Sequence, residues 1–473
     1  MRNSIATTVL LVAVLVAVTL AGAGCPPRVR ADQTLRTDIV VIGGGAAGLA
    51  AAAQAAQDGA RVILVEKTSA LGGTTLRAGG GYDAAQTKWQ QEANVNLPVA
   101  QLEQTVFDFG RQQGNRELIR LFVTQSAAAL DWLSGQGLKL KLANPARFPS
   151  RHTVTEGSPG VELVRVLQAT LQQRGVQVLL DTTATELVTD RRRAVIGVKA
   201  LTKDNRTLFV QARGTIIATG GFGASADMAA ANLTAYPGIQ TNLVAPSATG
   251  DGIRMAQAIG ADLVQMGNAQ AYPVATAKGN VLRGFEVAGA ILVNNAGRRF
   301  VNELGDSNLV SQAILGQPAK TAWLVFDHAF REANQASVAA IPADLLAAGQ
   351  TPEELGARAG IDGAQLKATI NSYNSYVAGR SDPEFQRPNL QVPLTRAAFH
   401  AVRVNPSIYG TLGGIAINTD AQVLRGGQPV AGLYAAGDTV GGTFGYNRAG
   451  VTGTTSAVVM GRVAAKSAQR NLR

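Results

Sequence analysis

The sequence predicts an α/β protein with a helix-flanked parallel sheet, an antiparallel meander and an inserted second domain. Near the N-terminus, two apolar runs at residues 38–42 and 61–65 enclose a glycine-rich turn and an alanine-rich segment, as in a strand, helix and parallel strand. Residues 194–200 and 207–212 alternate apolar and polar side chains, which indicates the meander. Glycine-rich strand signals become sparse between residues 267 and 409 and then return, which indicates the insertion.

The turn after the first apolar run reads Gly-Gly-Gly-Ala-Ala-Gly. Gly43 is expected to make the tight turn, Gly45 to let the backbone approach a pyrophosphate, and Gly48 to let the helix pack on the strand. The helix start offers backbone N–H groups and its positive dipole end to phosphates. Glu66 follows Gly48 at roughly the 20-residue spacing where a carboxylate accepts hydrogen bonds from ribose hydroxyls. This order predicts a Rossmann-type dinucleotide site, and the motif alone fits FAD and NAD equally.

Further segments place helices and strands around this site. Helical periodicity predicts helices within residues 99–137 and 160–174. Residues 214–219 form an apolar run that ends in glycines, which is typical of a buried strand crossing beside a dinucleotide. Another helix is expected from residue 250, where Asp251 is either a cofactor contact or simply the N-cap.

Composition places the chain among ordinary globular proteins. It has 473 residues, 46% hydrophobic and 16% charged, and its length suggests about three domains at most. Lys+Arg 43 against Asp+Glu 32 give a net charge of +11, spread along the chain apart from a run of arginines at 191–193. No basic tail interleaved with aromatics is present, which argues against a nucleic-acid partner. The excess favours attraction of an anionic substrate or is simply a solvated basic surface.

Residues 1–31 are predicted to be an export signal, because a long apolar run is followed by turn-prone polar sequence. Cleavage is expected after Ala23 or after Ala31. Lipidation at Cys25 is a third option, although Gly22 stands where lipoprotein signals usually carry leucine. Because no twin arginine is present, the general export route to the periplasm or cell envelope is expected.

Cys25 is the single cysteine of the sequence. This excludes an internal disulfide, a cysteine-ligated iron–sulfur cluster and a c-type haem attachment within this chain. His152, His328 and His400 are well separated, so no metal site is predicted. A redox function therefore requires a separate electron donor or acceptor.

Several motifs in a fixed order carry a family resemblance: residues 38–67, 72–75, 218–223, Gly-Arg-Arg-Phe-Val-Asn-Glu at 297–303, Thr-Leu-Gly-Gly at 411–414 and Gly-Leu-Tyr-Ala-Ala-Gly-Asp at 432–438. Together they resemble the fumarate reductase/succinate dehydrogenase flavoprotein family. The resemblance is greatest to its soluble exported members, which include flavocytochrome c fumarate reductases, urocanate reductase and 3-ketosteroid dehydrogenases. It implies an FAD domain at residues 37–267 and 410–473, interrupted by a mobile α+β capping domain at 268–409, with substrate held between them.

The resemblance implies FAD as the cofactor. It places the pyrophosphate against Gly43, Gly45 and Gly48, the adenosine ribose at Glu66 and the ribityl chain at Asp438. The positive end of the last helix would face the flavin and stabilise the negative charge of its reduced form. The other residues expected along FAD are Ala47, Lys67, Gly72, Gly73, Thr74, Thr75, Gly80, Gly81, Ala184, Ala218, Thr219, Gly220, Asp251, Gly437, Arg448, Gly450 and Val451.

The chain departs from the family's pattern at the substrate positions. The arginine that donates a proton in the fumarate reductases aligns with Ser307, and the tyrosine of the steroid dehydrogenases is missing there too. Two family histidines align with Tyr272 and with Gly410, which follows Tyr409. Arg448 retains the anion-binding arginine of the Asn-Arg-x-Gly motif. Because each buried carboxylate of a dicarboxylate needs a cationic or strongly donating partner, these departures argue against fumarate itself.

The predicted substrate site consists of Tyr272, Tyr409, Tyr446 and Arg448, with Ser307 at the position of the proton donor. A monocarboxylate or an enone with an apolar or aromatic body fits, with the tyrosines as walls or hydrogen-bond donors; the alternative for each tyrosine is a structural aromatic. The predicted function is hydride transfer between flavin N5 and a C–C bond next to a carboxylate or carbonyl. The alternatives are an FAD oxidase that uses dioxygen and a flavin-loaded electron carrier with a degenerate active site.

One further pair is ambiguous. Arg283 and Glu286 occupy, in swapped order, the positions of the family's proton-relay carboxylate and arginine. They are either a relay or a surface ion pair.

Overall fold

The computed structural model describes residues 31–282 and 284–472. The signal segment predicted before Ala31, with Cys25 and the cleavage site at Ala23, lies outside the described residues, as does Arg283. Within residues 31–282 and 284–472, no helix combines the length and the apolar character needed to cross a bilayer.

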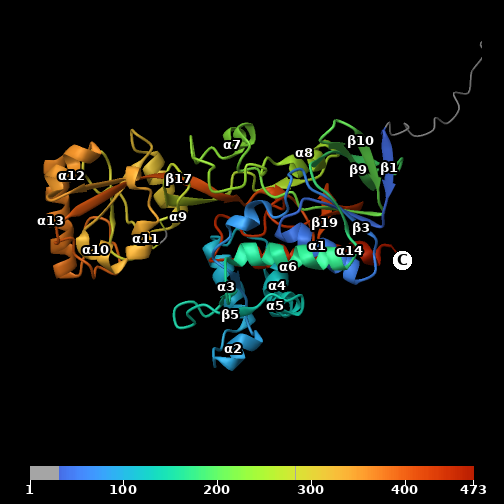
Figure 1. Cartoon of the computed structure of the whole chain (residues 1–473), viewed down its shortest axis with the longest axis horizontal. Helices are drawn as coiled ribbons and strands as arrows, with labels where there is room; N and C mark the ends of the chain where they lie inside the picture. Colours follow the sequence, from blue (N-terminus) through green and yellow to red (C-terminus); the bar gives the residue numbers. More distant parts are fainter. Residues whose placement is uncertain (1–30, 283, 473) are drawn as a thin grey trace, which may run out of the picture. The chain divides into compact units, whose positions relative to one another are not determined.

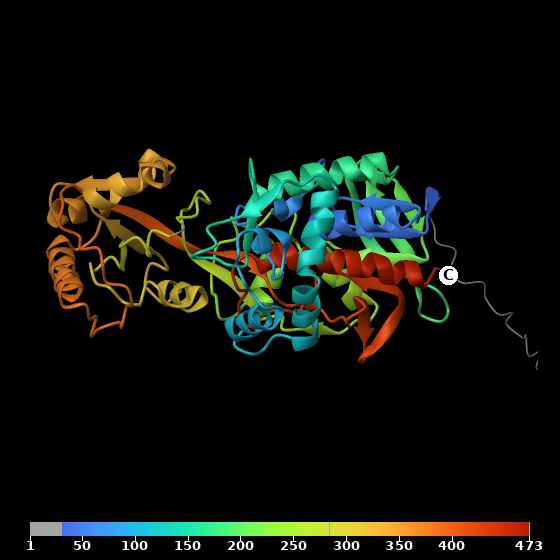
Figure 2. The same ribbon diagram turned by 90° about the horizontal axis from the view of Figure 1, so that it is seen from below.

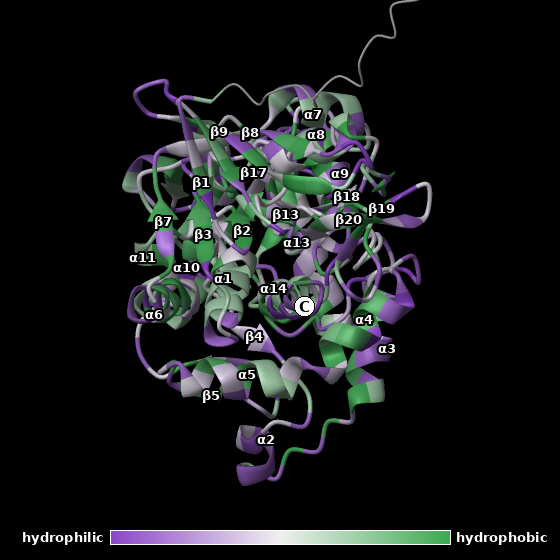
Figure 3. Ribbon diagram, turned by 90° about the vertical axis from the view of Figure 1, so that its right-hand side faces the viewer, coloured by the Kyte–Doolittle hydropathy of each residue, from purple (hydrophilic) through white to green (hydrophobic). Residues whose placement is uncertain are grey.

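A six-stranded sheet forms the centre of the FAD-type fold. Its strands, in spatial order, are β19 (Gln422–Arg425), β20 (Gln428–Ala435), β11 (Gly214–Ile217), β2 (Ile39–Ile42), β3 (Val62–Val65) and β7 (Gln177–Leu179). All neighbours are parallel except β19 with β20. Every residue of β2, β3 and β11 is buried, as a sheet covered on both faces requires, and β2 and β3 are green in Figure 3. The predicted Rossmann-type α/β class is confirmed.

Helices α1 (Ala46–Gln57) and α14 (Thr452–Arg470) pack against this sheet, and α6 (Pro159–Gln173) lies beside α1 (Figure 1). Helix α1 contacts both others, and Figure 2 shows α14 in red beside the blue N-terminal elements. Gly461 of α14 permits a close approach to α1, since a Cβ added there would lie 2.3 Å from the carbonyl oxygen of Ala47. This packing fixes the start of both helices at the carboxyl ends of the strands.

The predicted meander is formed by β8 (Thr182–Thr189), β9 (Val195–Thr202) and β10 (Thr207–Gln211), and β1 (Gln33–Arg36) adds to it in parallel. The predicted helical region after residue 99 contains three helices, α3 (Val99–Phe109), α4 (Arg116–Thr124) and α5 (Ser126–Gly135). Asn115 is the N-cap of α4, and its side chain accepts hydrogen bonds from the backbone N–H groups of Glu117 and Leu118. Helix α2 (Lys88–Glu92) and a sheet of β4 (Tyr82–Asp83), β5 (Leu140–Leu142) and β6 (Arg151–Val154) complete this part.

A second sheet is antiparallel and lies within the segment predicted as the insertion. Its strands are β13 (Ala269–Ala275), β17 (Phe399–Thr411), β15 (Ala322–Phe326) and β14 (Ile291–Val293), with β16 (Leu346–Gly349) also paired to β17. Side chains alternate across a strand, so successive residues of β14 pack into different apolar clusters. Leu292 packs into one cluster, and Ile291 and Val293 pack into the other. Both faces are therefore covered, by α9 (Ser307–Leu315), α10 (His328–Ala333), α11 (Gln335–Ala339), η2 (Ala343–Leu345), α12 (Pro352–Ala359) and α13 (Gly363–Gly379) among other segments. The domain limits at 268 and 409 and the mobility of the insertion stay predictions.

The remaining elements are short and surround the strand ends: η1 (Gly73–Arg77), α7 (Ala226–Asn232), α8 (Asp251–Ala258), β12 (Leu263–Val264) and β18 (Gly414–Ile415). Gly250 is the N-cap of α8 with φ of 78°, so Asp251 is the first helical residue and not the N-cap. Its carboxylate is thus available for a different partner.

Candidate functional site

A cavity of about 330 Å³ lies where the parallel strands end. The residues after the carboxyl ends of β2, β3, β11 and β20 all line it, which is where ligands bind in open α/β sheets. Most of the residues predicted for the cofactor line this cavity, namely Gly43, Gly45, Ala47, Glu66, Lys67, Gly73, Thr74, Thr75, Gly80, Ala184, Ala218, Thr219, Gly220, Asp251, Gly437, Asp438, Arg448, Gly450 and Val451.

Three predicted cofactor glycines serve backbone packing instead of lining the cavity. A Cβ on Gly48 would lie 1.9 Å from the carbonyl oxygen of Gly43, so this glycine lets α1 approach the loop, as predicted for the third glycine. Gly81 has φ of 94°, and its Cβ would lie 2.0 Å from a backbone oxygen of β6. Gly72 has φ of 119° and packs against Leu76. The expectation of direct cofactor contact is not supported at these positions.

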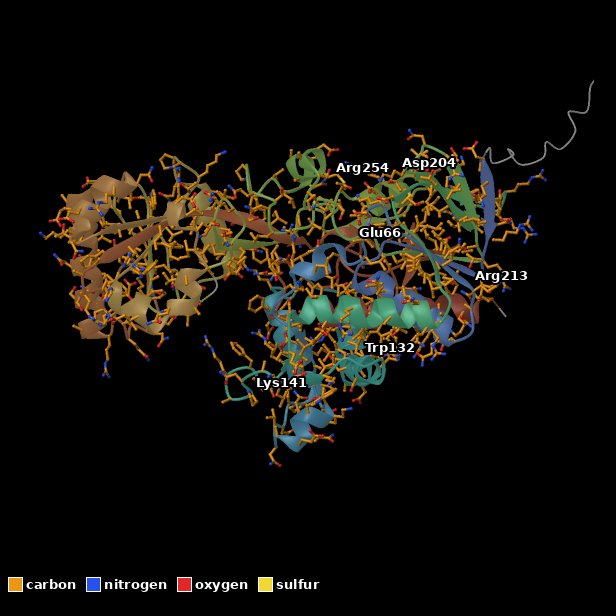
Figure 4. The ribbon with its side chains drawn as sticks, viewed as in Figure 1. Glu66, Trp132, Lys141, Asp204, Arg213 and Arg254 are labelled. Carbon is orange, nitrogen blue, oxygen red and sulfur yellow. The ribbon has the colours of Figure 1, made fainter. Side chains whose placement is uncertain are left out.

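Glu66 braces the glycine loop from the end of β3. Its Oε2 accepts from the backbone N–H of Gly44 at 2.8 Å, and its Oε1 accepts from the N–H and hydroxyl of Thr68 at 2.9 and 2.7 Å. Figure 4 shows Glu66 within the interior of this region, whereas Arg213 lies at its margin. Both oxygens of Glu66 thus accept from protein groups, and its contact with a ribose stays a prediction.

Lys67 forms a second polar group beside it. Its Nζ lies 2.6 Å from Asp251 Oδ2 and 2.6 Å from the hydroxyl of Thr249. The sequence placed both ends of this ion pair among the cofactor residues without predicting that they contact each other.

Arg448 is fixed on the other side of the cavity. Its side chain is 8% exposed; Nη1 donates to Asp438 Oδ1 at 3.0 Å and Nε to Gln270 Oε1 at 3.1 Å. A Cβ on Gly453 would lie 2.4 Å from Nη1, so a glycine in the first turn of α14 makes room for the guanidinium. A Cβ on Gly410 would lie 3.2 Å from Nη2. Because position 410 is a glycine, it has no side chain to separate Nη2 from the cavity.

The start of α14 faces the same cavity through Gly450 and Val451, and no side chain caps this helix. The N–H of Val451 donates to Asp83 Oδ2 at 2.6 Å, and the Ser150 hydroxyl donates to Asp83 Oδ1 at 2.7 Å. Burial raises the pKa of the Asp83 carboxyl above its usual value. A helix dipole and a partly satisfied carboxyl thus lie together at the position predicted for the flavin.

Tyr272 of β13 and Tyr409 of β17 both line the cavity, with ring centroids 6.5 Å apart and ring planes inclined by 45°. Ser307, the first residue of α9, also lines it, and its hydroxyl lies 3.3 Å from the side-chain nitrogen of Asn447. The structure therefore brings three predicted substrate residues together with Arg448.

Tyr446 is placed elsewhere. Its ring lies under the guanidinium of Arg111, at 3.8 Å, and its hydroxyl interacts with Tyr236 and Gln312, whereas the cavity lining does not include it. The sequence interval to Arg448 suggested proximity, but the backbone turn at Gly445, with φ of 75°, directs Tyr446 away. For Glu286, the backbone oxygen accepts from Arg387 Nη2 at 2.6 Å; its predicted relay partner Arg283 lies outside the described residues.

Gln270 and Arg77 are among the cavity residues that the sequence analysis missed. They belong to no motif with a known function, and their roles depend on contacts to Arg448 and Asn242 from distant parts of the chain. The only signal in the sequence was proximity along the chain, of Gln270 to Tyr272 and of Arg77 to the glycines after residue 72.

The Arg-Arg-Phe-Val-Asn-Glu motif lies away from the cavity. Glu303 accepts from Arg299 through both oxygens at 2.8 Å and lies 3.1 Å from Arg387 Nη1, while Arg299 Nη2 also donates to Asp382 at 2.9 Å. These side chains are at most 2% exposed. The motif is therefore a buried ion network of the second sheet.

Comparisons with known proteins agree with this geometry. A protein-family model described as an FAD binding domain matches residues 38–454. The chain is 34% identical over 444 residues to an NADH:fumarate oxidoreductase of Klebsiella pneumoniae. This alignment covers 92% of this chain and 48% of that protein. The chain is 32% identical over 464 residues to a urocanate reductase of Eggerthella lenta, covering 93% of this chain and 76% of the other. The chain thus spans about half the length of the Klebsiella protein.

A solved structure, the open conformation of a flavocytochrome c3 fumarate reductase, superimposes with a TM-score of 0.84 at 33% identity, covering 93% of this chain and 79% of the other. The cavity fits FAD on its own chemistry, because its glycine loop and the starts of α1 and α14 that line it suit phosphates and a reduced flavin. A carboxylate at the end of β3 completes the dinucleotide set. The chain therefore belongs to the fumarate reductase/succinate dehydrogenase family of FAD-dependent flavoprotein oxidoreductases, and FAD is its cofactor.

Proposed function

We propose that the protein transfers a hydride between flavin N5 and a C–C bond next to a carboxylate or carbonyl, and that its substrate is not fumarate. The observation that carries this proposal is the buried Arg448 guanidinium in the FAD cavity, beside two tyrosines and without an arginine at position 307. Bound FAD supplies the hydride chemistry. The similar proteins named above are reductases of fumarate and urocanate, which supports a reaction at a C–C double bond.

Arg448 is proposed to bind the carboxylate or carbonyl oxygen of the substrate. Asp438 and Gln270 hold Nη1 and Nε, so the direction of the guanidinium is fixed before the substrate arrives. Gly410 leaves the approach to Nη2 clear. A charge-assisted hydrogen bond from Nη2 would polarise the double bond toward hydride addition at the carbon remote from the acid group.

The single proton that completes the reduction, added to the carbon that does not receive the hydride, is proposed to come from Tyr272 or Tyr409. Ser307 occupies the position of the family's donor, but a serine hydroxyl is a far weaker acid than a phenol. The two tilted tyrosine rings also present aromatic surface to the cavity, which favours an aryl or alkyl body on the substrate. Water released from this surface would leave the reacting carbons in a dry environment.

The electrons are proposed to come from, or go to, a separate redox partner. The chain covers 48% of the NADH-dependent relative, so the remaining half of that protein has no counterpart in residues 1–473. Export to the periplasm or cell envelope, and a lipid anchor at Cys25, stay parts of this proposal and are supported by the sequence of residues 1–31 alone.

The test uses purified protein with bound FAD, reduced by dithionite under nitrogen and mixed with 2-enoates, aryl acrylates and enones. Reoxidation of the flavin by one of these classes is expected, and Arg448→Met should slow it at least about a hundredfold, equivalent to roughly 3 kcal/mol from one charged hydrogen bond. Arg403→Met is the matched control, because Arg403 is exposed on β17 and binds only the Thr321 hydroxyl among the contacts of the described residues.

Three other outcomes would contradict the proposal. Rapid reoxidation by dioxygen, with no response to any organic acceptor or its saturated partner, would identify an oxidase. Electron transfer to an artificial acceptor that Arg448→Met leaves unchanged, again with no organic acceptor, would identify an electron carrier. Equal losses in Arg448→Met and Arg403→Met would show that the effect is not local.

A further inference from the structure

A second guanidinium lies at the edge of the same cavity. Arg77, the last residue of η1, lines the cavity and is otherwise exposed to solvent. Its Nη1 donates to the backbone oxygen of Asn242 at 2.9 Å. A guanidinium has five N–H donors, so one such bond leaves most of its binding capacity for a ligand.

The contacts of Asn242 locate Arg77 relative to the two sheet strands of the site. Asn242 Oδ1 accepts from the Ser407 hydroxyl at 2.8 Å, and Ser407 lies opposite Tyr272 in the β13–β17 pair. Arg77 is therefore linked, through Asn242, to the register position of the β13–β17 pair that Ser407 and Tyr272 occupy.

Arg448 is linked to a neighbouring register position of the same strand pair. Its Nε donates to Gln270, and Gln270 lies opposite Gly410 in the same strand pair. The step from Gln270 to Tyr272 is two residues, about 6 to 7 Å along a strand. The two guanidinium groups, which line the same cavity as the tyrosine pair, are thus linked to two different register positions of these strands, one by way of Gln270 and the other by way of Asn242.

We propose that Arg77 binds a second anionic or strongly accepting group at the far end of the substrate. This inference rests on the proposed function and narrows its substrate class to unsaturated acids or enones that carry another carboxylate or similar oxyanion across a flat body. Fumarate does not meet this description, because its two carboxylates are attached to the reacting carbons and leave no body to lie along the tyrosines. The net charge of +11 favours such a doubly anionic ligand.

The exposure of Arg77 suits this role. A largely hydrated guanidinium costs little to keep charged, and its planar fork can hold a carboxylate through two parallel hydrogen bonds. The bond to Asn242 positions Arg77 at the cavity without neutralising it, since a backbone carbonyl carries no net charge. Arg77 would thus contribute to the choice of substrate and leave the reacting bond to Arg448 and the tyrosines.

The experiment compares trans-cinnamate with para-carboxycinnamate as oxidants of the reduced protein, in the wild type, Arg77→Leu and the control Arg403→Leu. The wild type and the control are expected to prefer para-carboxycinnamate by about tenfold in kcat/KM, the effect of one charge-assisted hydrogen bond. Arg77→Leu should abolish this preference, because kcat/KM for para-carboxycinnamate should fall about tenfold more than the value for cinnamate. Equal loss for both acids would overturn the proposal.

A binding measurement keeps this test independent of turnover. Benzoate and terephthalate are titrated against the oxidised protein, and the flavin absorbance reports their Kd values. Tighter binding of terephthalate that disappears only in Arg77→Leu supports the inference even if neither cinnamate is reduced, in which case the proposed reaction fails separately. Loss of FAD from Arg77→Leu would show that Arg77 holds the cofactor instead, and no difference between the two acids in the wild type would also overturn the proposal.

Discussion

Removal of the Glu303 carboxylate is predicted to destabilise the second sheet severely. Glu303 is fully buried and lies between the guanidinium groups of Arg299 and Arg387; its Oε1 also accepts from the backbone N–H of Leu292 at 3.2 Å. In Glu303→Ala, Arg299 would keep Asp382, whereas the buried Arg387 guanidinium would lose its carboxylate partner and keep only the carbonyl oxygens of Ala290 and Glu286. Breaking a buried ion pair by removing one partner costs about 3 to 5 kcal/mol, because the remaining charge is left without compensation.

The assay is urea unfolding of the FAD-loaded protein, followed by tryptophan fluorescence, because Trp323 lies on β15 of this sheet. The matched control is Glu353→Ala, which removes an exposed carboxylate 2.6 Å from Lys367 and should cost about 0.2 to 1 kcal/mol. Glu303→Gln, which keeps the shape and one acceptor oxygen, should fall between the two. If Glu303→Ala and Glu353→Ala lower the free energy of unfolding equally, the network does not stabilise the fold in the way argued here.

Two further predictions concern the FAD domain. Burial lowers the pKa of His152 to about 4, and its Nδ1 donates to the Ser150 carbonyl while Nε2 accepts from Thr87. The stability due to the neutral imidazole should therefore be present above its ordinary pKa of about 6.5 and be lost toward pH 4, a change of about 3 kcal/mol at most. His152→Gln should flatten this pH dependence when thermal unfolding is measured at a series of pH values. Gly48→Ala should weaken FAD retention on a desalting column and lower the free energy of unfolding by about 1 to 3 kcal/mol, because its Cβ would meet the Gly43 oxygen. The control Gly135→Ala, with open space around it in α5, should retain FAD and raise the free energy of unfolding by up to about 1 kcal/mol. FAD retention equal to that of the wild type in Gly48→Ala would contradict the packing argument.

The parallel sheet and the phosphate loop could be predicted from the sequence because their signals are local. Buried strands such as β2 and β3 consist of continuous apolar residues, and Gly43 and Gly48 have the spacing that a close backbone approach requires. The meander followed from simple alternation. For these elements, each residue's neighbours along the chain already determine its environment.

The substrate side of the cavity was predicted less completely, because it is assembled from distant segments. Arg77 reaches Asn242 across 165 positions, and Gln270 reaches Arg448 across 178, with no periodic signal to connect them. Tyr446 is two positions from Arg448 yet faces Arg111, since a local turn outweighs proximity in sequence. Likewise, Arg299 and Glu303 were recognised as a family motif, but their burial against Asp382, 83 positions away, became apparent only in three dimensions.

Strand β17 has a consequence for how the substrate could be admitted. It is continuous over 13 residues, pairing with β15 and β16 in its first half and with β13 in its second half, where Tyr409 and Gly410 enter the cavity wall. Because the same strand pairs with the outer sheet and carries Tyr409, a tilt of that sheet would move the tyrosine with it. Entry and release of ligand would then be governed by flexing at the irregular pairing near Gln270 and Ala275, so stiffening those two places should slow exchange without altering the chemistry at the ring.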